Sequence, residues 1–326
     1  MAGPIVGLDG EFVDKVAIRP DGRLVVGGFF VEFDGLHREN ITRLNSDGST
    51  DPGFVPQPGP SHAVLDLALD DDEKVVVVGG FWEVNGKSQR CIARLNANGS
   101  LDDEFNIGTG SYGAIYSIVR QPDGKFIIGG EFTSFNQSAA GRVARLNANG
   151  SVDVTFTAGA GAGSTIFALA LQPDWKVLVG GQFTNFAGVT HPGLVRLNSN
   201  GTVDPSFAPP FKMQVFALAL QPDGKVLVGG YLETETQLAR NVVRLNADGS
   251  LDGSFAPGLW MNGGVGNIAL QSDGRVIIGG GFTTVNGYPR TYLARLNGDQ
   301  QVQPDPIRIR ESVSYTHLTL PTILRV

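Results

Sequence analysis

The chain has 326 residues, which is enough for two average domains or for one large all-β domain. Its net charge is −7 and its lysines and arginines are spread evenly, which excludes the basic stripe that nucleic-acid binding requires. No run of about 18 apolar residues is present, so we expect no membrane span, and the single cysteine, Cys91, excludes an intramolecular disulfide.

Six similar segments follow one another along the chain, and each contains the same apolar runs. The first runs of the six segments are "VDKVAIR" (13–19), "VLDLALD" (64–70), "IYSIVRQ" (115–121), "IFALALQ" (166–172), "VFALALQ" (215–221) and "VGNIALQ" (265–271). In the fourth segment the later runs are "KVLVGGQF" (176–183), "GLVRLN" (193–198) and "TVDPSF" (202–207). Short runs separated by Pro-Asp-Gly and Asn-Gly turns are typical of β-strands rather than helices.

The spacing of the segments predicts a propeller. A recurrent arginine stands at positions 43, 94, 145, 196, 244 and 295, in steps of 51 residues except for one of 48. The first run is apolar on both faces, which indicates a sheet covered on both sides. We therefore predict an all-β, six-bladed β-propeller with four-stranded antiparallel blades. A β-solenoid is the alternative, although its rungs are usually shorter.

A Gly-Gly pair recurs in the second run, at 27–28, 79–80, 129–130, 180–181, 229–230 and 279–280. Glycine inside a strand indicates a bulge or close packing. A phosphate cradle would need a helix to follow the glycines, and the pattern predicts none.

The motif "ARLNANGSLDDEF" (93–105) predicts a hairpin with a three-residue loop. In that hairpin Arg94 lies opposite Asp102, and directly opposed residues share a face and can form an ion pair. The same count predicts these further structural pairs: Arg43 with Asp51, Arg145 with Asp153, Arg196 with Asp204, and Arg244 with Asp252.

The sixth segment lacks the end of this motif, because "ARLNGDQQVQ" has Gln303 where aspartate is expected. The missing piece resembles "GLDGEF" at residues 7–12. We therefore expect the N-terminal strand to complete the last blade and close the ring, which would make Asp9 the partner of Arg295.

The signature "ALQPDGKVLVGG…VRLNADGSLDGSF" resembles the delta-60 repeat, a bacterial β-propeller repeat. The resemblance covers residues 7 to about 300 and implies a protein that is secreted or associated with the cell envelope. Local departures are "LDDDEK" (69–74), Trp175 in place of a turn glycine, and "YLETETQLAR" (231–240). The kelch repeat is a weaker match, because its tyrosine and tryptophan spacing is absent.

Residues 1–311 are expected to form a single propeller domain, and residues 312–326 break the repeat. The stretch "VSYTHLTLPTI" resembles the translated read-through of a sequencing adapter, so we expect a non-native tail. A native terminal strand, suggested by the alternation in "THLTL", is the alternative. If the tail is not native, the natural chain continues beyond about residue 311, and the absence of a signal peptide at "MAGPIVGLDGEF" carries little weight.

No catalytic or metal-binding motif emerges. The Asn-x-Asp-Gly segments do not match the calcium-binding loop of EF-hands, and turn chemistry explains their Asn and Asp residues. The histidines, His37, His62, His191 and His317, share no ligand spacing. We therefore expect no cofactor and no metal, with calcium as the one ion that the segments suggest at all.

Two classes of function remain. The first is a non-catalytic binding or display scaffold, extracellular or in the cell envelope, that recognises a glycan or a protein. The alternative is a polysaccharide-acting hydrolase or lyase that uses the central propeller pocket, and such an enzyme would place polar residues in the first runs. The polar departures there, Asp14, Asp66, Tyr116 and Arg120, form no recognisable catalytic set.

The ligand is expected at the end of the blades where the linkers and the loops between second and third strands lie. These loops differ in every copy, whereas the turns at the other end are nearly the same. Variable loops on a rigid scaffold commonly carry recognition. The alternative is that these linkers vary without any functional purpose. The predicted contact residues, with Trp260 as the anchor, are Tyr112, Phe211, Met213, Trp260, Met261 and Tyr288.

Overall fold

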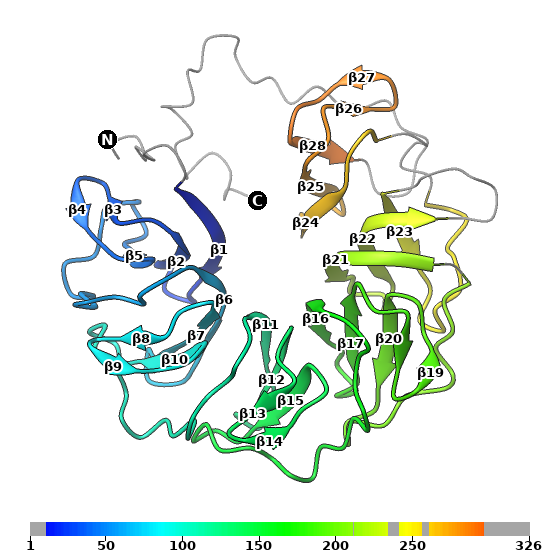
Figure 1. Cartoon of the computed structure of the whole chain (residues 1–326). Helices are drawn as coiled ribbons and strands as arrows, with labels where there is room; N and C mark the ends of the chain where they lie inside the picture. The colour runs from blue at the N-terminus through cyan, green and yellow to red at the C-terminus, as the bar shows by residue number, and fades with distance from the viewer. Residues whose placement is uncertain (1–10, 211, 234–240, 256–260, 297–326) are drawn as a thin grey trace. The chain divides into compact units, whose positions relative to one another are not determined.

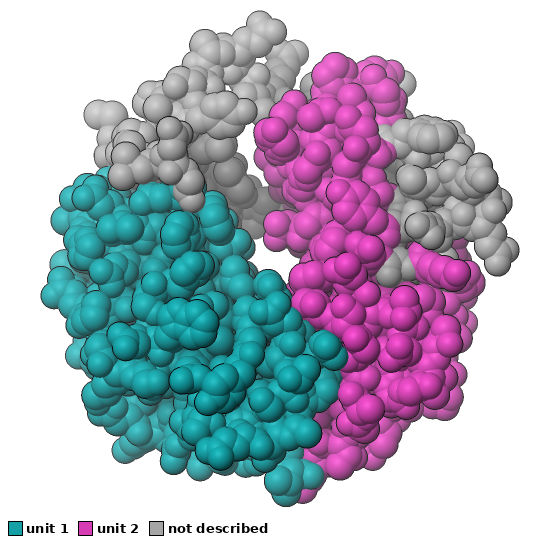
Figure 2. All heavy atoms as spheres, in the orientation of Figure 1, with its two compact units in different colours: residues 1–154, 309–326 teal, residues 155–308 magenta. Residues whose placement is uncertain are grey.

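The computed structural model describes residues 11–210, 212–233, 241–255 and 261–296. The secondary structure of these residues is entirely β and forms repeated small antiparallel sheets (Figure 1). The chain divides into two compact units, residues 1–154 with 309–326 and residues 155–308, which are coloured separately in Figure 2. Each unit contains three of the six repeats.

Every repeat contributes one three-stranded antiparallel sheet. The strands of unit 1 are β1 Phe12–Ile18, β2 Leu24–Phe29, β3 Glu32–Phe33, β4 Leu36–His37, β5 Ile41–Leu44, β6 Val64–Leu69, β7 Val75–Gly79, β8 Glu83–Val84, β9 Lys87–Ser88, β10 Ile92–Leu95, β11 Ile115–Arg120, β12 Phe126–Gly130, β13 Ser134–Phe135, β14 Ser138–Ala139 and β15 Val143–Leu146. Its three sheets have the strand orders β1-β2-β5, β6-β7-β10 and β11-β12-β15.

The strands of unit 2 are β16 Ile166–Leu171, β17 Val177–Gly181, β18 Asn185–Phe186, β19 Val189–Thr190, β20 Leu194–Leu197, β21 Lys212–Leu220, β22 Val226–Glu233, β23 Val242–Leu245, β24 Val265–Leu270, β25 Val276–Gly280, β26 Thr284–Val285, β27 Tyr288–Pro289 and β28 Leu293–Leu296. The sheets are β16-β17-β20, β21-β22-β23 and β24-β25-β28. The fifth repeat departs from the others in the length of β21 and β22, which have 9 and 8 residues.

The third repeat illustrates how the segments are connected. Its second and third strands are joined through a two-residue hairpin, β13 with β14. Ser111, in the linker before the repeat, forms a bridge with Phe135 of this hairpin. The linker is therefore held against the hairpin of the repeat that it precedes.

The predicted fourth strand is reduced to a single bridge in the structure. In the third repeat Val152 bridges Leu146 of β15, and the chain then leaves the sheet. In the second repeat the equivalent segment turns at Asp102, whose carbonyl accepts the N–H of Phe105 at 3.2 Å. The turn directs the Phe105 side chain into the core, where it is 3% exposed. The fourth strand thus ends early, where the chain turns to bury the phenylalanine. Both repeats still contain the four segments that the sequence predicts.

Within each unit, hydrophobic cores lie between successive repeats. One core combines Val76 and Ile92 of the second repeat with Ile115 and Phe126 of the third. In unit 2, Leu178 of the fourth repeat packs in the same way with side chains of the fifth. The sheets are therefore covered on both faces, as the apolar first strands predict.

The Gly-Gly pairs lie opposite a β-bulge of the first strand. In the third repeat Ile115 pairs with Gly130 and Ser117 with Gly129, so Tyr116 is the extra residue. A Cβ at Gly130 would overlap the carbonyl oxygen of Ala114, which excludes any larger residue. The close packing predicted from the glycines is therefore present.

The alignment of the second repeat requires a correction of one residue. Its bulge places Val64 opposite Gly79 and Asp66 opposite Val78. The structural equivalent of the Gly-Gly pair is thus Val78-Gly79, and Gly80 lies beyond the sheet. The sequence pair 79–80 suggested the wrong alignment because four valines precede the two glycines here, one apolar residue more than in the third repeat.

The predicted ring closure involves residues outside the described part of the chain. Residues 7–10, including Asp9, are outside it, as is the tail 312–326. Arg295 lies on β28. Closure by the N-terminal strand stays a prediction.

Candidate functional site

The sheet of each repeat has two ends, one with short turns of nearly constant sequence and one with loops that vary between repeats. Consecutive strands run in opposite directions, so the turns after the first and third strands share one end of the sheet. We call this end the turn rim; in the third repeat it comprises residues 121–125 and 147–151. We call the opposite end the variable rim; in the third repeat it comprises the linker 106–114 and the loop 131–142.

The turn rim contains one Arg–Asp ion pair in each of the first five repeats. The Nε–Oδ2 distances are 2.7 Å for Arg43–Asp51, 2.7 Å for Arg94–Asp102, 2.8 Å for Arg145–Asp153, 2.7 Å for Arg196–Asp204 and 2.7 Å for Arg244–Asp252. These side chains are almost completely buried. A lysine from the preceding turn contacts the same carboxylate in four repeats: Lys74, Lys125, Lys176 and Lys225, at 2.7–3.0 Å.

The arginine also packs on an aromatic ring that sequence reasoning did not connect to it. The Arg94 guanidinium lies 4.8 Å from the centroid of Phe105, and Arg196 lies at the same distance from Phe207. Cation–π contact and ion pair together explain why arginine, aspartate and phenylalanine recur as a set. The recurrent motif is therefore a structural module.

The electrostatics of the module favour ionised aspartates. Burial alone would raise the pKa of Asp204, but hydrogen bonds from Ser206, Lys176 and Arg196 outweigh burial and hold the pKa well below its ordinary value. A carboxylate with so many hydrogen-bond donors has a structural role, and its low pKa makes it a poor acid or base for catalysis.

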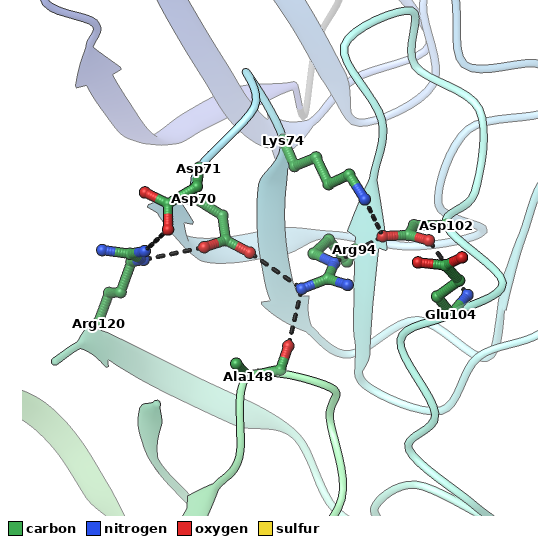
Figure 3. Close-up of polar contacts among 8 residues, drawn as sticks. All are labelled: Asp70, Asp71, Lys74, Arg94, Asp102, Glu104, Arg120 and Ala148. Carbon is green, nitrogen blue, oxygen red and sulfur yellow. Dashed lines mark hydrogen bonds and ion pairs between the residues drawn. The ribbon is translucent and has the colours of Figure 1, made fainter. Parts of the chain in front are cut away.

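The acidic turn "LDDDEK" of the second repeat joins two repeats of unit 1 (Figure 3). Asp70 accepts hydrogen bonds from Arg94 at 3.1 Å and from Arg120 of the third repeat at 2.9 Å. Asp71 also contacts Arg120, and Arg94 donates to the carbonyl of Ala148 at 2.8 Å. The departure from the repeat sequence is thus an inter-repeat ion-pair network.

Asp66 breaks the repeat pattern on a first strand, and its carboxylate is saturated with donors. It is 5% exposed and accepts hydrogen bonds from the N–H groups of Leu67 at 2.9 Å and Ile118 at 3.0 Å. The Ser117 hydroxyl lies at 3.2 Å and the Lys15 ammonium at 2.7 Å. Asp66 therefore connects the first strands of three successive repeats.

The other three polar departures, Asp14, Tyr116 and Arg120, differ in their surroundings. Burial raises the pKa of Asp14, in the β1 bulge, to about 6. Burial also raises the pKa of Tyr116, and the charge of Glu131 adds to the effect; the Tyr116 hydroxyl lies 3.5 Å from Glu131. Arg120 is engaged by Asp70. Of the four departures, Asp66 and Arg120 are thus occupied by structural contacts.

The predicted ligand-binding residues are distributed over both units. Tyr112, in unit 1, is 64% exposed and stacks with Arg90, whose guanidinium lies 4.4 Å from the ring centroid. Tyr288 is 52% exposed on β27 of unit 2. Met213 lies on β21, opposite Leu232. The predicted anchor Trp260 and Phe211 lie outside the described residues.

Met261 is a core residue, contrary to the prediction that it contacts ligand. Its backbone bridges Val285 and its side chain is 8% exposed in the core of the sixth repeat. The linker pairs with the β26–β27 hairpin and thereby turns this side chain inward. Sequence reasoning treated the linker as a free loop and missed this pairing.

Several exposed aromatic residues of the variable rim were not predicted. The side chain of Trp82 is 63% exposed, and the backbone N–H of this residue donates to the Ser61 hydroxyl at 3.0 Å. Phe29 packs with Phe12 and with His62, with centroid distances of 5.7 and 5.1 Å. Trp82 could have been noticed, because three other repeats have threonine at its position.

Neither a metal-binding cluster nor a reactive thiol is found among the described residues. The described residues contain no group of three or more His, Cys, Asp or Glu side chains that could hold a metal ion. Cys91 is buried, and burial raises the pKa of its thiol to about 11. The described residues also contain no helix suited to crossing a membrane.

The repeated sheets, their bulged first strands and the shared cores define a β-propeller repeat protein. The chain belongs to the family described as "Domain of unknown function (DUF5122) beta-propeller". The sequence model of this family matches residues 19–54, 71–105, 121–156, 172–207, 221–255 and 271–299. None of the curated proteins matches the chain.

Solved structures share the fold at low sequence identity. An extracellular domain of a hybrid two component system protein from B. thetaiotaomicron is 14% identical with a TM-score of 0.59, covering 96% of this chain and 36% of that one. This chain thus spans about a third of that protein's solved domain. Virginiamycin B lyase from Staphylococcus aureus is 15% identical with a TM-score of 0.57, covering 94% and 88% of the two chains. A gluconolactonase from Xanthomonas campestris is 14% identical with a TM-score of 0.50, covering 85% and 92%.

Proposed function

We propose that this protein is a non-catalytic binding scaffold, extracellular or in the cell envelope, whose variable rim docks a glycan or protein. One observation carries the proposal: among the described residues, the exposed aromatic side chains other than Trp175 belong to the variable rim. They are Phe12, Phe29, Trp82, Tyr112, Tyr231, Tyr288 and Tyr292. Exposed aromatic rings provide large contact areas at low entropic cost and are common binding anchors.

The composition of the two rims supports this assignment. The buried charged side chains of the turn rim pair with one another, as in the pairs of Arg94 with Asp102 and Asp70. These side chains are therefore not available to a partner. The location outside the cell is supported by likeness to an extracellular domain, which is a likeness of fold.

The alternative is a hydrolase or lyase acting on polysaccharide. The likeness to a lyase and a gluconolactonase favours it at the level of fold, and Asp14 has a pKa near 6, in the range of a general base. We favour the scaffold because Asp66 and Arg120, two of the polar residues on the first strands, form structural ion pairs and are therefore not available for catalysis.

The test uses unit 1 and a matched control. Binding of the full chain to a glycan array and to candidate protein partners is compared for Trp82→Ala, Tyr112→Ala and Trp175→Ala. The first two variants should weaken binding by roughly tenfold or more, the effect of losing about 1.4 kcal/mol. Trp175→Ala removes an exposed aromatic ring of the turn rim and should leave binding unchanged.

The opposite pattern would contradict the proposal. If Trp175→Ala weakens binding while Trp82→Ala and Tyr112→Ala do not, the partner uses the turn rim. If the chain instead cleaves a polysaccharide and Asp14→Asn abolishes the cleavage, the enzyme alternative holds.

A further inference from the structure

The bulges of unit 2 place three equivalent side-chain positions on neighbouring first strands. Phe167 is the extra residue of the β16 bulge, Phe216 that of β21 and Gly266 that of β24. Strand β21 packs against both β16 and β24. The three positions therefore form a row across the three repeats of this unit.

The row is aromatic over two of its three positions. The rings of Phe167 and Phe216 are 5.2 Å apart between centroids. Tyr231, at the variable-rim end of the fifth repeat, meets Phe216 edge-on with a centroid distance of 5.7 Å and an angle of 85°. Tyr231 is 51% exposed, and the other two rings are half-buried. Together the three rings form a partly exposed aromatic surface.

Gly266 leaves the third position open. A Cβ at this residue would meet no atom within 4 Å, and its φ is not in the left-handed region. The fold therefore does not require glycine here, and the equivalent positions of the other repeats hold Asp14, Leu65, Tyr116 or a phenylalanine. By contrast, a Cβ at Gly264 nearby would meet the Tyr231 ring at 2.9 Å, so the glycine allows that ring to lie close to the backbone of the sixth repeat.

The polar groups directly beside the row are uncharged, and the charged pair of this ladder, Lys212 opposite Glu233, lies two residues further along the strands. Gln214 lies directly opposite Tyr231 in the β21–β22 ladder, so the two side chains share a face, and both are exposed. They add an amide and a hydroxyl to the aromatic surface. Aromatic faces bind the apolar C–H face of a sugar ring, and neutral donors and acceptors suit its hydroxyls.

We propose that the space at Gly266, beside Phe216 and Tyr231, binds a neutral hexopyranose ring of a glycan. This inference rests on the proposed function, because Tyr231 belongs to the variable rim, and it specifies the chemical class of ligand. The ring stacks on the aromatic side chains, occupies the space that a side chain fills in other repeats, and bonds to Gln214 and the Tyr231 hydroxyl. The lack of charge in the row favours neutral over acidic sugars.

The decisive variant fills the open position. Binding of neutral methyl hexopyranosides (glucoside, galactoside and mannoside) to the full chain is measured by calorimetry and ligand-observed NMR. At least one should bind the wild type saturably, and Gly266→Phe should weaken that binding at least tenfold. Gln214→Ala should weaken it severalfold, and methyl glucuronide should bind at least tenfold more weakly than the matching glucoside.

The matched control is Gly253→Phe. A Cβ at Gly253 also meets no atom within 4 Å, and the equivalent residue of the third repeat, Val154, is 82% exposed. Gly253 lies near the turn rim, so this variant should bind as the wild type does. The melting temperatures of both variants report whether each one folds, and Gln214→Ala provides the test if Gly266→Phe does not.

Three outcomes would overturn the inference: no neutral hexopyranoside binds the wild type, Gly266→Phe binds as well as wild type, or only planar aromatic or acidic compounds bind. These outcomes leave the proposed function standing if Trp82→Ala still weakens binding to a partner. Loss of monosaccharide binding in Gly266→Phe with no effect of Trp82→Ala or Tyr112→Ala would support the sugar site and restrict recognition to unit 2.

Discussion

Two adjacent glycines of the sixth repeat allow a sharp test of the bulge packing. A Cβ at Gly280 would overlap the carbonyl oxygen of Gly264 and lie 3.0 Å from Cα of Val265. A Cβ at Gly281 would meet nothing within 4 Å. Neither glycine has a φ in the left-handed region, so the comparison isolates steric contact from backbone strain.

The expected magnitude follows from what Gly280→Ala must displace. The overlap forces β24 and β25 apart, at a cost of about 1–3 kcal/mol for overpacking. The same movement stretches the hydrogen bond from Gly281 N–H to Gly264 O, now 3.0 Å, which contributes about 0.5–1.5 kcal/mol. We expect a total loss of about 2–4 kcal/mol, partly offset by the smaller entropy of the unfolded alanine chain.

Thermal and urea unfolding of both variants provide the measurement. At roughly 2 °C per kcal/mol, Gly280→Ala should lower the melting temperature by about 4–8 °C. Gly281→Ala should change stability by less than about 1 kcal/mol and in the stabilising direction. Equal effects of the two substitutions, or an unchanged Gly280→Ala, would refute the steric account.

Two further predictions concern carboxylates of unit 1. Asp66→Ala should lower the free energy of unfolding by about 2–4 kcal/mol in urea titrations, because it leaves the N–H groups of Leu67 and Ile118 without their acceptor. The Asp71 side chain is 82% exposed, so Asp71→Ala should lower the free energy of unfolding by less than about 1 kcal/mol. Similar losses in the two variants would argue against the Asp66 network. The pKa of Asp14 is raised to about 6, so its charge opposes folding above that pH and the penalty disappears as pH falls toward 4. Asp14→Asn should therefore raise the melting temperature slightly at pH 7.5 and leave it unchanged at pH 4, and a stabilisation that persists at pH 4 would show that charge is not its cause.

Local patterns predicted the strands and the ion pairs of the turn rim. The spacing of Arg94 and Asp102 across a three-residue loop determines their register, so a count along the sequence placed them together. The apolar first strands indicated sheets covered on both faces, and the cores shared by successive repeats have that arrangement. These features depend on residues close in sequence or repeated at a constant interval.

Features that depend on contacts between distant segments were not predictable in this way. The burial of Met261 depends on its pairing with Val285, and the sequence of the linker does not predict this pairing. The partners of Asp66 come from repeats on either side, at Lys15 and Ser117. The open position at Gly266 became apparent only when the bulges aligned it with Phe216.

Because the cores are shared between repeats, a single repeat lacks a complete hydrophobic core and is not expected to fold alone. An excised second repeat would expose Val77 and Ile92, which are 0% exposed in the intact chain. Stability in such an array resides in the interfaces between neighbours, so a substitution in one repeat destabilises the repeats on both sides of it. Duplication or deletion of a segment of about 51 residues therefore adds or removes one interface of the same kind.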